Sequence, residues 1–209
     1  MKKPNITPAE FEMYLKNSLL SIEKSIKDLM AAGIINKQEA DRYCLMQTAG
    51  HHDPVMVLAI RGYYKTTMGN PSTNDRGIFD DAFILKGPNY FQTFNANTDP
   101  RIIKKGVGML LPGWHLFKQG WHGYGKASGH QAFRTANNRE VLPVIRDGEK
   151  GIKEGVTVNI HKGGQYQTNS IACQTVIADQ WKEFKDNAYR LMNLEGQKVL
   201  PYLLLENNS

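Results

Sequence analysis

A histidine and a cysteine that lie twelve residues apart are the pair in this sequence best suited to chemistry. The residues from Val156 to His161 alternate between apolar and polar types, which predicts a half-buried strand that ends with His161 on its polar face. Gly163 and Gly164 follow, and they predict a sharp turn because glycine accepts a positive φ without steric cost. A return of the chain after this turn is expected to bring Cys173 to His161.

The side-chain types of Cys173 and His161 indicate nucleophilic catalysis. A thiol beside an imidazole forms a thiolate–imidazolium pair, which is a usable nucleophile near neutral pH. The expected reaction is acyl transfer through a thioester, in which His161 takes the thiol proton and Cys173 attacks an amide carbonyl. The backbone N–H groups of Cys173 and of Ala172 or Ile171 are expected to hold the oxyanion. Ser170 is expected to hydrogen-bond either the loop or the imidazole, and in the second case to fix its tautomer.

The motif His161-Lys-Gly-Gly followed by Ser170-x-x-Cys173 resembles the core of the L,D-transpeptidase catalytic domain family. The resemblance implies a cysteine nucleophile, a histidine base and peptidoglycan stem peptides as the substrate. The chain has Ala172 where the family has glycine, and Gln174-Thr175 where the family has an arginine. Ala172, Gln174, Gly163 and Gly164 are expected to contact substrate. The short interval between the histidine and the cysteine is similar to that of compact members found in phage and effector proteins.

The middle of the chain, residues 106–139, is dense in glycine, aromatic residues and histidine. Its aromatic side chains are expected to form a stacking wall for a sugar or a peptide, with the histidines adding polar contacts. The alternative is that the tryptophans fill the core and the glycines make turns. The spacing of the histidines matches no standard zinc motif, so neither a metal nor another cofactor is predicted. The aromatic residues are Trp114, Trp121 and Tyr124, and the histidines are His115, His122 and His130.

Two regions are expected, an N-terminal helical hairpin with a linker at 1–53 and a β-rich catalytic domain at 54–209. Capping boxes beginning at Thr7 and at Asn36 predict two helices, the first of which ends at Gly33. Cys44 lies on the apolar face of the second helix and is interpreted as a packing residue. The hairpin is expected to dock on the main domain or on a partner. His51-His52-Asp53 is interpreted as part of a linker, because adjacent side chains do not converge on a metal.

The β-rich region predicts an α+β fold, a mostly β sandwich or barrel of the L,D-transpeptidase type with a helix after the catalytic cysteine. Asp80 and Asp81 are successive residues of one predicted strand, so they face opposite ways and are expected to take solvent or turn roles. Pro201 predicts that the last strand is an edge strand. The predicted strands are residues 55–64, 78–85, 90–95, 140–145, 156–161 and 198–206, and the predicted helix begins at Ile177.

The composition is that of an ordinary globular protein, with 209 residues of which 41% are hydrophobic and 22% charged. A net charge of +6 favours anionic partners, but no basic block is interleaved with aromatic residues, so nucleic acid is not expected. Two cysteines are too few for a disulfide framework. The start has no apolar segment of a signal peptide, and no apolar run reaches the ~18 residues of a membrane span. Synthesis in the cytoplasm is therefore expected, with delivery to the periplasm or cell wall by another factor.

Three functional hypotheses remain open from the residues alone. The first is a cysteine peptidase or transpeptidase that acts on peptidoglycan stem peptides; water as acceptor gives hydrolysis and an amine gives transfer. The second is a cytosolic cysteine amidase or isopeptidase with another amide substrate. The third is a non-catalytic β-domain that binds a glycan or nucleic acid, in which Cys173 is a small buried packing residue.

Overall fold

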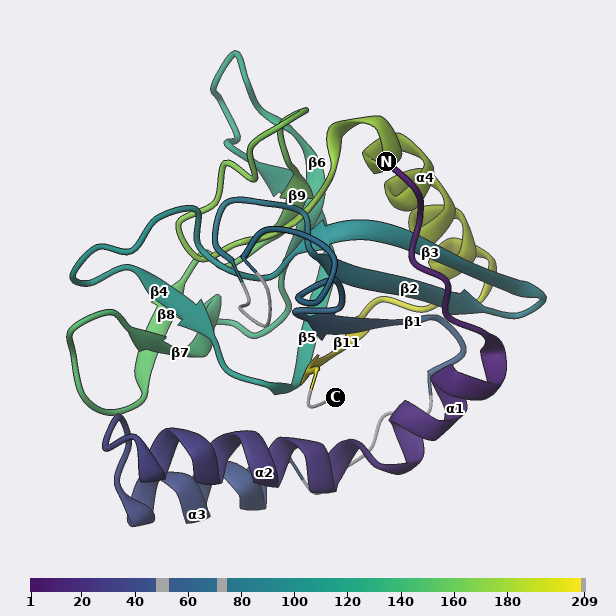
Figure 1. Ribbon diagram of the computed structural model, residues 1–209. Helices are drawn as coiled ribbons and strands as arrows, with labels where there is room; N and C mark the ends of the chain where they lie inside the picture. The colour runs from purple at the N-terminus through teal and green to yellow at the C-terminus, as the bar shows by residue number, and fades with distance from the viewer. Residues whose placement is uncertain (48–52, 71–74, 208–209) are drawn as a thin grey trace.

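The computed structural model describes residues 1–47, 53–70 and 75–207, which form four helices and eleven strands (Figure 1). The helices are α1 (Pro8–Lys16), α2 (Ser18–Ala31), α3 (Lys37–Met46) and α4 (Ala178–Leu194). The strands are β1 (Met56–Arg61), β2 (Asp81–Gly87), β3 (Tyr90–Asn97), β4 (Gly108–Leu110), β5 (Gly113–His122), β6 (His130–Thr135), β7 (Val141–Arg146), β8 (Lys153–Val156), β9 (Ile160–Lys162), β10 (Gln174–Val176) and β11 (Leu200–Glu206).

Eight of these strands close into a barrel in the order β1-β11-β5-β6-β9-β10-β3-β2. The other three form a small sheet, β4-β7-β8, which lies at one side of the barrel (left in Figure 1). The predicted α+β class is confirmed, and so is the mostly β character of the main body. In the described part of the chain, no helix combines the length and apolar character needed to cross a bilayer.

Helix α4 packs into the core that fills the barrel interior. Its buried face includes Trp181, Phe184, Ala188 and Leu191, the apolar stripe that helical periodicity predicts. These side chains meet inward-facing aromatic residues of the strands, among them Phe94, whose ring centroid is 5.3 Å from that of Phe184. Burial of this stripe therefore holds the element that follows Cys173 against the barrel.

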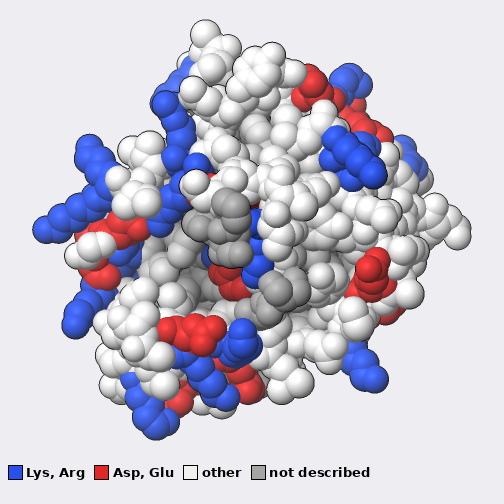
Figure 2. Space-filling view, viewed as in Figure 1, with Lys and Arg blue, Asp and Glu red and all other residues white. Residues whose placement is uncertain are grey.

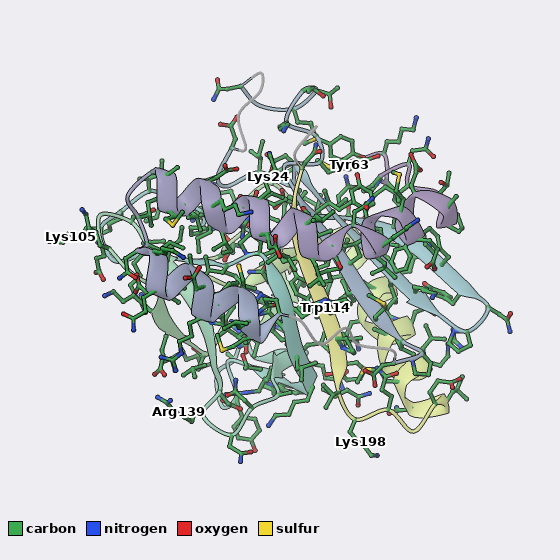
Figure 3. The ribbon with its side chains drawn as sticks, turned by 90° about the horizontal axis from the view of Figure 1, so that it is seen from below. Lys24, Tyr63, Lys105, Trp114, Arg139 and Lys198 are labelled. Carbon is green, nitrogen blue, oxygen red and sulfur yellow. The ribbon has the colours of Figure 1, made fainter. Side chains whose placement is uncertain are left out.

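The N-terminal helices cover the outer face of the barrel at β1 and β11 (below the barrel in Figure 1, and towards the viewer in Figure 3). Alternate residues of β1 point inward and outward, and the outward Leu58 and Ile60 pack against Ile22 and Ile26 of α2. Both faces of β1 are thus buried, which explains its continuous apolar sequence. The predicted docking of the helices on the main domain is confirmed.

The N-terminal helix boundaries differ from the prediction at one residue. The two capping boxes form as expected, at Thr7 and at Asn36. The single helix predicted to run to Gly33 is instead two helices separated by Asn17, whose φ and ψ are −96° and 6°. The break lets α1 and α2 follow different directions along the barrel, so that Phe11 reaches Phe91 of β3. His51 and His52 lie outside the described residues.

Pro201 does not mark an edge strand, because β11 pairs with β1 on one side and β5 on the other. The pairing with β1 begins at Tyr202, one residue after the proline. The missing N–H of Pro201 therefore falls before that ladder starts, which is a position where a strand tolerates proline. The prediction of a strand was right, and the prediction of an edge was wrong.

Asp80 and Asp81 are fully buried, which contradicts the expected solvent or turn role. Asp81 accepts hydrogen bonds from the backbone N–H groups of Gly62 and Thr98, both at 2.5 Å. Burial raises the pKa of Asp80 to about 7 and raises the pKa of Asp81 well above its ordinary value, and Asp99 adds to both effects. Both carboxyl groups are therefore buried in the protein rather than exposed at its surface.

Arg61, at the end of β1, is the buried cation beside these acids. Its Nε lies 3.0 Å from Asp99 Oδ1, and its Nη1 lies 2.8 Å from Glu206 Oε1. The guanidinium also donates to the carbonyl oxygens of Thr98 and Leu110. This network joins β1, β11 and the segment after β3.

Candidate active site

A backbone break at Thr157 creates the site. A single strand is predicted from Val156 to His161, but β8 ends at Val156 and β9 begins at Ile160. Thr157 has φ of +56°, which is rare for a β-branched residue and is a strained conformation. The break sends β8 into the small sheet and β9 into the barrel, so a cleft forms between them.

His161 and Cys173 come together because β9 and β10 are adjacent parallel strands. His161 of β9 is paired with Thr175 of β10, and Cys173 directly precedes β10. His122 joins them from β5, and one ligand atom of each of the three side chains lies within 4.8 Å of the others. The predicted convergence of the histidine and the cysteine is thus present, with a second imidazole beside it.

His161 has a defined tautomer. Its Nδ1 lies 2.8 Å from the carbonyl oxygen of Lys162. Because a carbonyl oxygen can only accept, Nδ1 carries the proton and donates a hydrogen bond to that oxygen. Nε2 is therefore left with a lone pair, as a base or a metal ligand requires. Burial and the neighbouring His122 lower the pKa of His161 to about 3, so the ring is neutral at pH 7.

His122 stacks on His161, with ring centroids 4.1 Å apart and planes 18° apart. It is the cross-strand partner of His130, whose ring lies 5.6 Å away. Burial is the main cause that lowers the pKa of His122, and the neighbouring His130 adds to it. The Nδ2 atom of Asn159 lies 3.1 Å from His122 Nδ1, and the Asn159 Oδ1 atom is buried without a hydrogen-bond partner among the described residues.

The Cys173 thiol rests as a neutral group. Its Sγ accepts from the backbone N–H of Asn159 at 3.4 Å and donates to the carbonyl oxygen of Thr157 at 3.6 Å. Burial raises the pKa of the thiol. The expected thiolate–imidazolium pair is therefore corrected to a neutral thiol beside a neutral imidazole, because burial disfavours both charges.

Three residues of the predicted motif have supporting roles. Ser170 donates to the carbonyl oxygen of Cys173 and so takes the loop role, while Lys162 and not Ser170 fixes the tautomer of the imidazole. Neither Gly163 nor Gly164 has a positive φ. A Cβ at Gly163 would lie 2.7 Å from Phe79 Cζ, and one at Gly164 would lie 2.6 Å from the carbonyl oxygen of Gln167. Close packing within the chain, rather than a positive φ, accounts for these glycines, and neither is among the residues that line the cleft.

The cleft that holds the three side chains has a volume of about 380 Å³ and lies between the small sheet and the barrel. Ala172 and Ile171 line it, as predicted for residues beside the nucleophile. Among the described residues, the backbone N–H groups of Ala172 and Cys173 donate to no protein acceptor. Arg146 of β7 adds a cation to the lining. Its guanidinium donates to the carbonyl oxygens of Gly106 and Glu154, which hold it in place.

Other predicted substrate contacts lie elsewhere. Gln174 is buried inside the barrel, where its Oε1 accepts from the Tyr202 hydroxyl at 2.8 Å. Trp114 (labelled in Figure 3) packs against the core between barrel and helices, and its backbone N–H donates to the side-chain Oε1 of Gln47. Trp121 lines a separate shallow hollow with His130 and Trp181. Only His122 of the predicted aromatic and histidine wall reaches the cleft, while His115 is buried against the Leu111 carbonyl.

Three residues of the site were not predicted to act there. Asn159 is two residues before His161 in the alternating segment, so its placement on the same polar side was visible in the pattern. Thr157 and Arg146 carried no such pattern, because their roles depend on the break between β8 and β9 and on the approach of the small sheet.

The described residues contain one cluster of side chains whose metal-binding atoms lie close together, and it consists of His122, His161 and Cys173. Comparison with protein-family models found no family that matches the chain. Comparisons with curated proteins and with solved structures found no match either.

Proposed function

We propose that this protein is a cysteine peptidase or transpeptidase of the L,D-transpeptidase type that acts on peptidoglycan stem peptides through a thioester on Cys173. The observation that carries the proposal is the convergence of the Cys173 thiol with the imidazoles of His161 and His122 at one cleft. The order of residues in the motif supports the same family: a histidine, two glycines, a serine and a cysteine. We also propose that the barrel has the fold of this family.

Because the Cys173 thiol and the His161 imidazole are both neutral at rest, the thiol must lose its proton during the attack. The Nε2 atom of His161 takes the thiol proton as Sγ of Cys173 forms a bond to the carbonyl carbon of the substrate amide. The C–N bond then breaks, and the imidazolium returns the proton to the leaving amine. Water or an amine attacks the thioester and releases the thiol. The thiol must first turn from the Thr157 carbonyl to the imidazole, a rearrangement that substrate binding can drive.

Two features of the cleft support an acyl substrate. The N–H groups of Ala172 and Cys173 are available to an oxyanion, and such donors contribute about 3–4 kcal/mol each in other acyl-transfer enzymes. His122 stacks on His161 and restricts the orientation of the base. The chemistry therefore has a nucleophile, a base and an oxyanion site on neighbouring segments.

The charge of the cleft supports a substrate that carries a carboxylate. Arg146 lines the cleft and presents the planar guanidinium that carboxylates prefer. Lys104, Lys105, Lys150 and Lys153, which lie in or beside the strands of the small sheet, are exposed. Figure 2 shows Lys and Arg side chains at left, together with Asp and Glu side chains. A stem peptide, with its free carboxylates, matches this polarity.

The test is incubation of the purified protein with peptidoglycan sacculi and with stem-peptide dimers, in a reducing buffer that contains EDTA. Mass spectrometry should detect cleaved peptides with wild type and with the matched control Cys44→Ser. Cys173→Ala should abolish cleavage, and His161→Gln should slow it by about 10²–10⁴-fold. Equal turnover by Cys173→Ala would overturn the proposal.

Addition of an amino acid as an amine acceptor separates the two reactions. A peptidase yields the same hydrolysed product with or without the acceptor, whereas a transpeptidase yields a peptide lengthened by the acceptor. Trapping of an acyl group on Cys173 by rapid acid quench identifies the thioester that both reactions share.

A further inference from the structure

We propose that His122, His161 and Cys173 form a binding site for a zinc ion. The proposal goes beyond acyl transfer and does not depend on it, because it requires only that the three side chains bind one cation. Their ligand atoms come from β5, β9 and the segment before β10, and all lie within 4.8 Å of one another. The spacing of histidines along the chain predicts no metal, so the site exists only through the barrel pairing.

The donor types select the metal. Two imidazole nitrogens and one thiolate suit Zn²⁺ or another late transition metal, whereas Mg²⁺ and Ca²⁺ prefer oxygen ligands. Three protein ligands leave a fourth tetrahedral position, and all three side chains line the cleft of about 380 Å³, which a further ligand could enter. Such an open position is typical of zinc that exchanges ligands with solvent, rather than of a closed structural centre.

The groups around the ligands orient the imidazoles. Nδ1 of His161 donates to the Lys162 carbonyl, so Nε2 is free to bind metal. A carbonyl partner on the second nitrogen is the usual arrangement for a metal-bound histidine. At His122 the structure differs, because the atom 3.1 Å from Nδ1 is the Asn159 amide nitrogen Nδ2, which is a donor. Metal binding requires the amide orientation in which Asn159 Oδ1 accepts from Nδ1–H, which leaves Nε2 of His122 with a lone pair.

Binding requires a small contraction and the loss of one proton. Zinc bonds of about 2.0–2.3 Å place tetrahedral ligand atoms roughly 3.3–3.7 Å apart, so the widest separation in the cluster closes by about 1 Å. Side-chain rotation of Cys173 away from the Thr157 carbonyl supplies such movement. The thiol proton passes to solvent as the S–Zn bond forms, and the neutral imidazoles release none. Zinc and an acyl substrate therefore compete for the same sulfur.

The first experiment is equilibrium dialysis of the full chain with Zn²⁺ alone, under reducing conditions at pH 7. One zinc per chain is expected for wild type and for two matched controls, Cys44→Ser and His130→Gln. Cys173→Ser, His161→Gln and His122→Gln should each bind at least tenfold more weakly. Asn159→Leu should also weaken binding by about 10–100-fold, while Asn159→Asp should retain it because a carboxylate can accept from the imidazole. Circular dichroism establishes that each variant is folded.

A second measurement uses wild-type protein and does not depend on whether variants of His122, His161 or Cys173 fold. Wild-type protein titrated with Co²⁺ should develop a thiolate-to-cobalt charge-transfer band, and Zn²⁺ should displace it and protect Cys173 from alkylation. Absence of that band, or zinc binding by Cys173→Ser equal to wild type, overturns the metal site. Because acyl transfer is measured in EDTA, its failure and the failure of zinc binding are distinguishable.

Discussion

The imidazole rings of His122 and His161 stack with centroids 4.1 Å apart, and the two residues come from strands that are not neighbours in the sheet. β6 lies between β5 and β9, so the rings meet across the end of the barrel, with His130 beside both. Two imidazolium ions at this distance would repel strongly. The cluster is therefore built for neutral rings, whether they act as a base or as metal ligands.

The neutral state of His161 predicts a loss of stability in acid. Its pKa is about 3 in the folded protein against an ordinary value of 6.5, so the unfolded chain binds more protons between these values. The stabilising effect is present in full above pH 6.5 and is lost as the pH falls toward 3. Urea unfolding at pH 7 and pH 4 should show a smaller loss for His161→Gln than for wild type. His115, whose pKa is about 4, contributes equally to both proteins. Equal losses in the two proteins would contradict the neutral assignment.

The raised pKa of the Cys173 thiol predicts slow alkylation at neutral pH. Burial is the main cause, so the rate of reaction with iodoacetamide should rise at a higher pH than for the same thiol in the urea-unfolded chain. Peptide mapping separates Cys173 from Cys44. An inflection below the ordinary thiol value would instead establish a resting thiolate–imidazolium pair.

The strained backbone at Thr157 predicts that glycine stabilises this position. Thr157→Gly removes a β-branched residue from φ of +56° and should raise the free energy of unfolding by about 1 kcal/mol. Val156→Gly is the matched control, because this exposed strand residue has no such strain and its replacement should be destabilising. Urea unfolding measures both. A loss of stability in Thr157→Gly as large as that in Val156→Gly would show that the bend carries no strain.

The buried ion pairs of Arg61 predict a large cost for its removal. Arg61→Met leaves the buried Asp99 without its cation and should lower the free energy of unfolding by about 3–5 kcal/mol. Arg139→Met removes an exposed arginine that pairs with Glu154, and it should change stability by no more than about 1 kcal/mol. Chemical denaturation of the two variants tests the difference, and equal effects would contradict the assigned role of Arg61.

The sequence by itself determined the local elements. Capping at Thr7 and Asn36, the apolar run of β1 and the stripe of α4 all depend on residues close in the chain, and each formed as predicted. The meeting of His161 and Cys173 was also predictable, because a short loop joins them. Local hydrogen bonding and side-chain periodicity decide such features.

The tertiary structure alone decided which distant residues complete the site. Barrel closure brings His122 of β5 to His161, and the strained break at Thr157 opens the cleft and admits Arg146 from the small sheet. The same closure buries Gln174 and turns Trp114 toward the helices. Strand neighbours in a barrel depend on contacts between segments far apart in the chain, and periodicity within one segment carries no information about its partner strands.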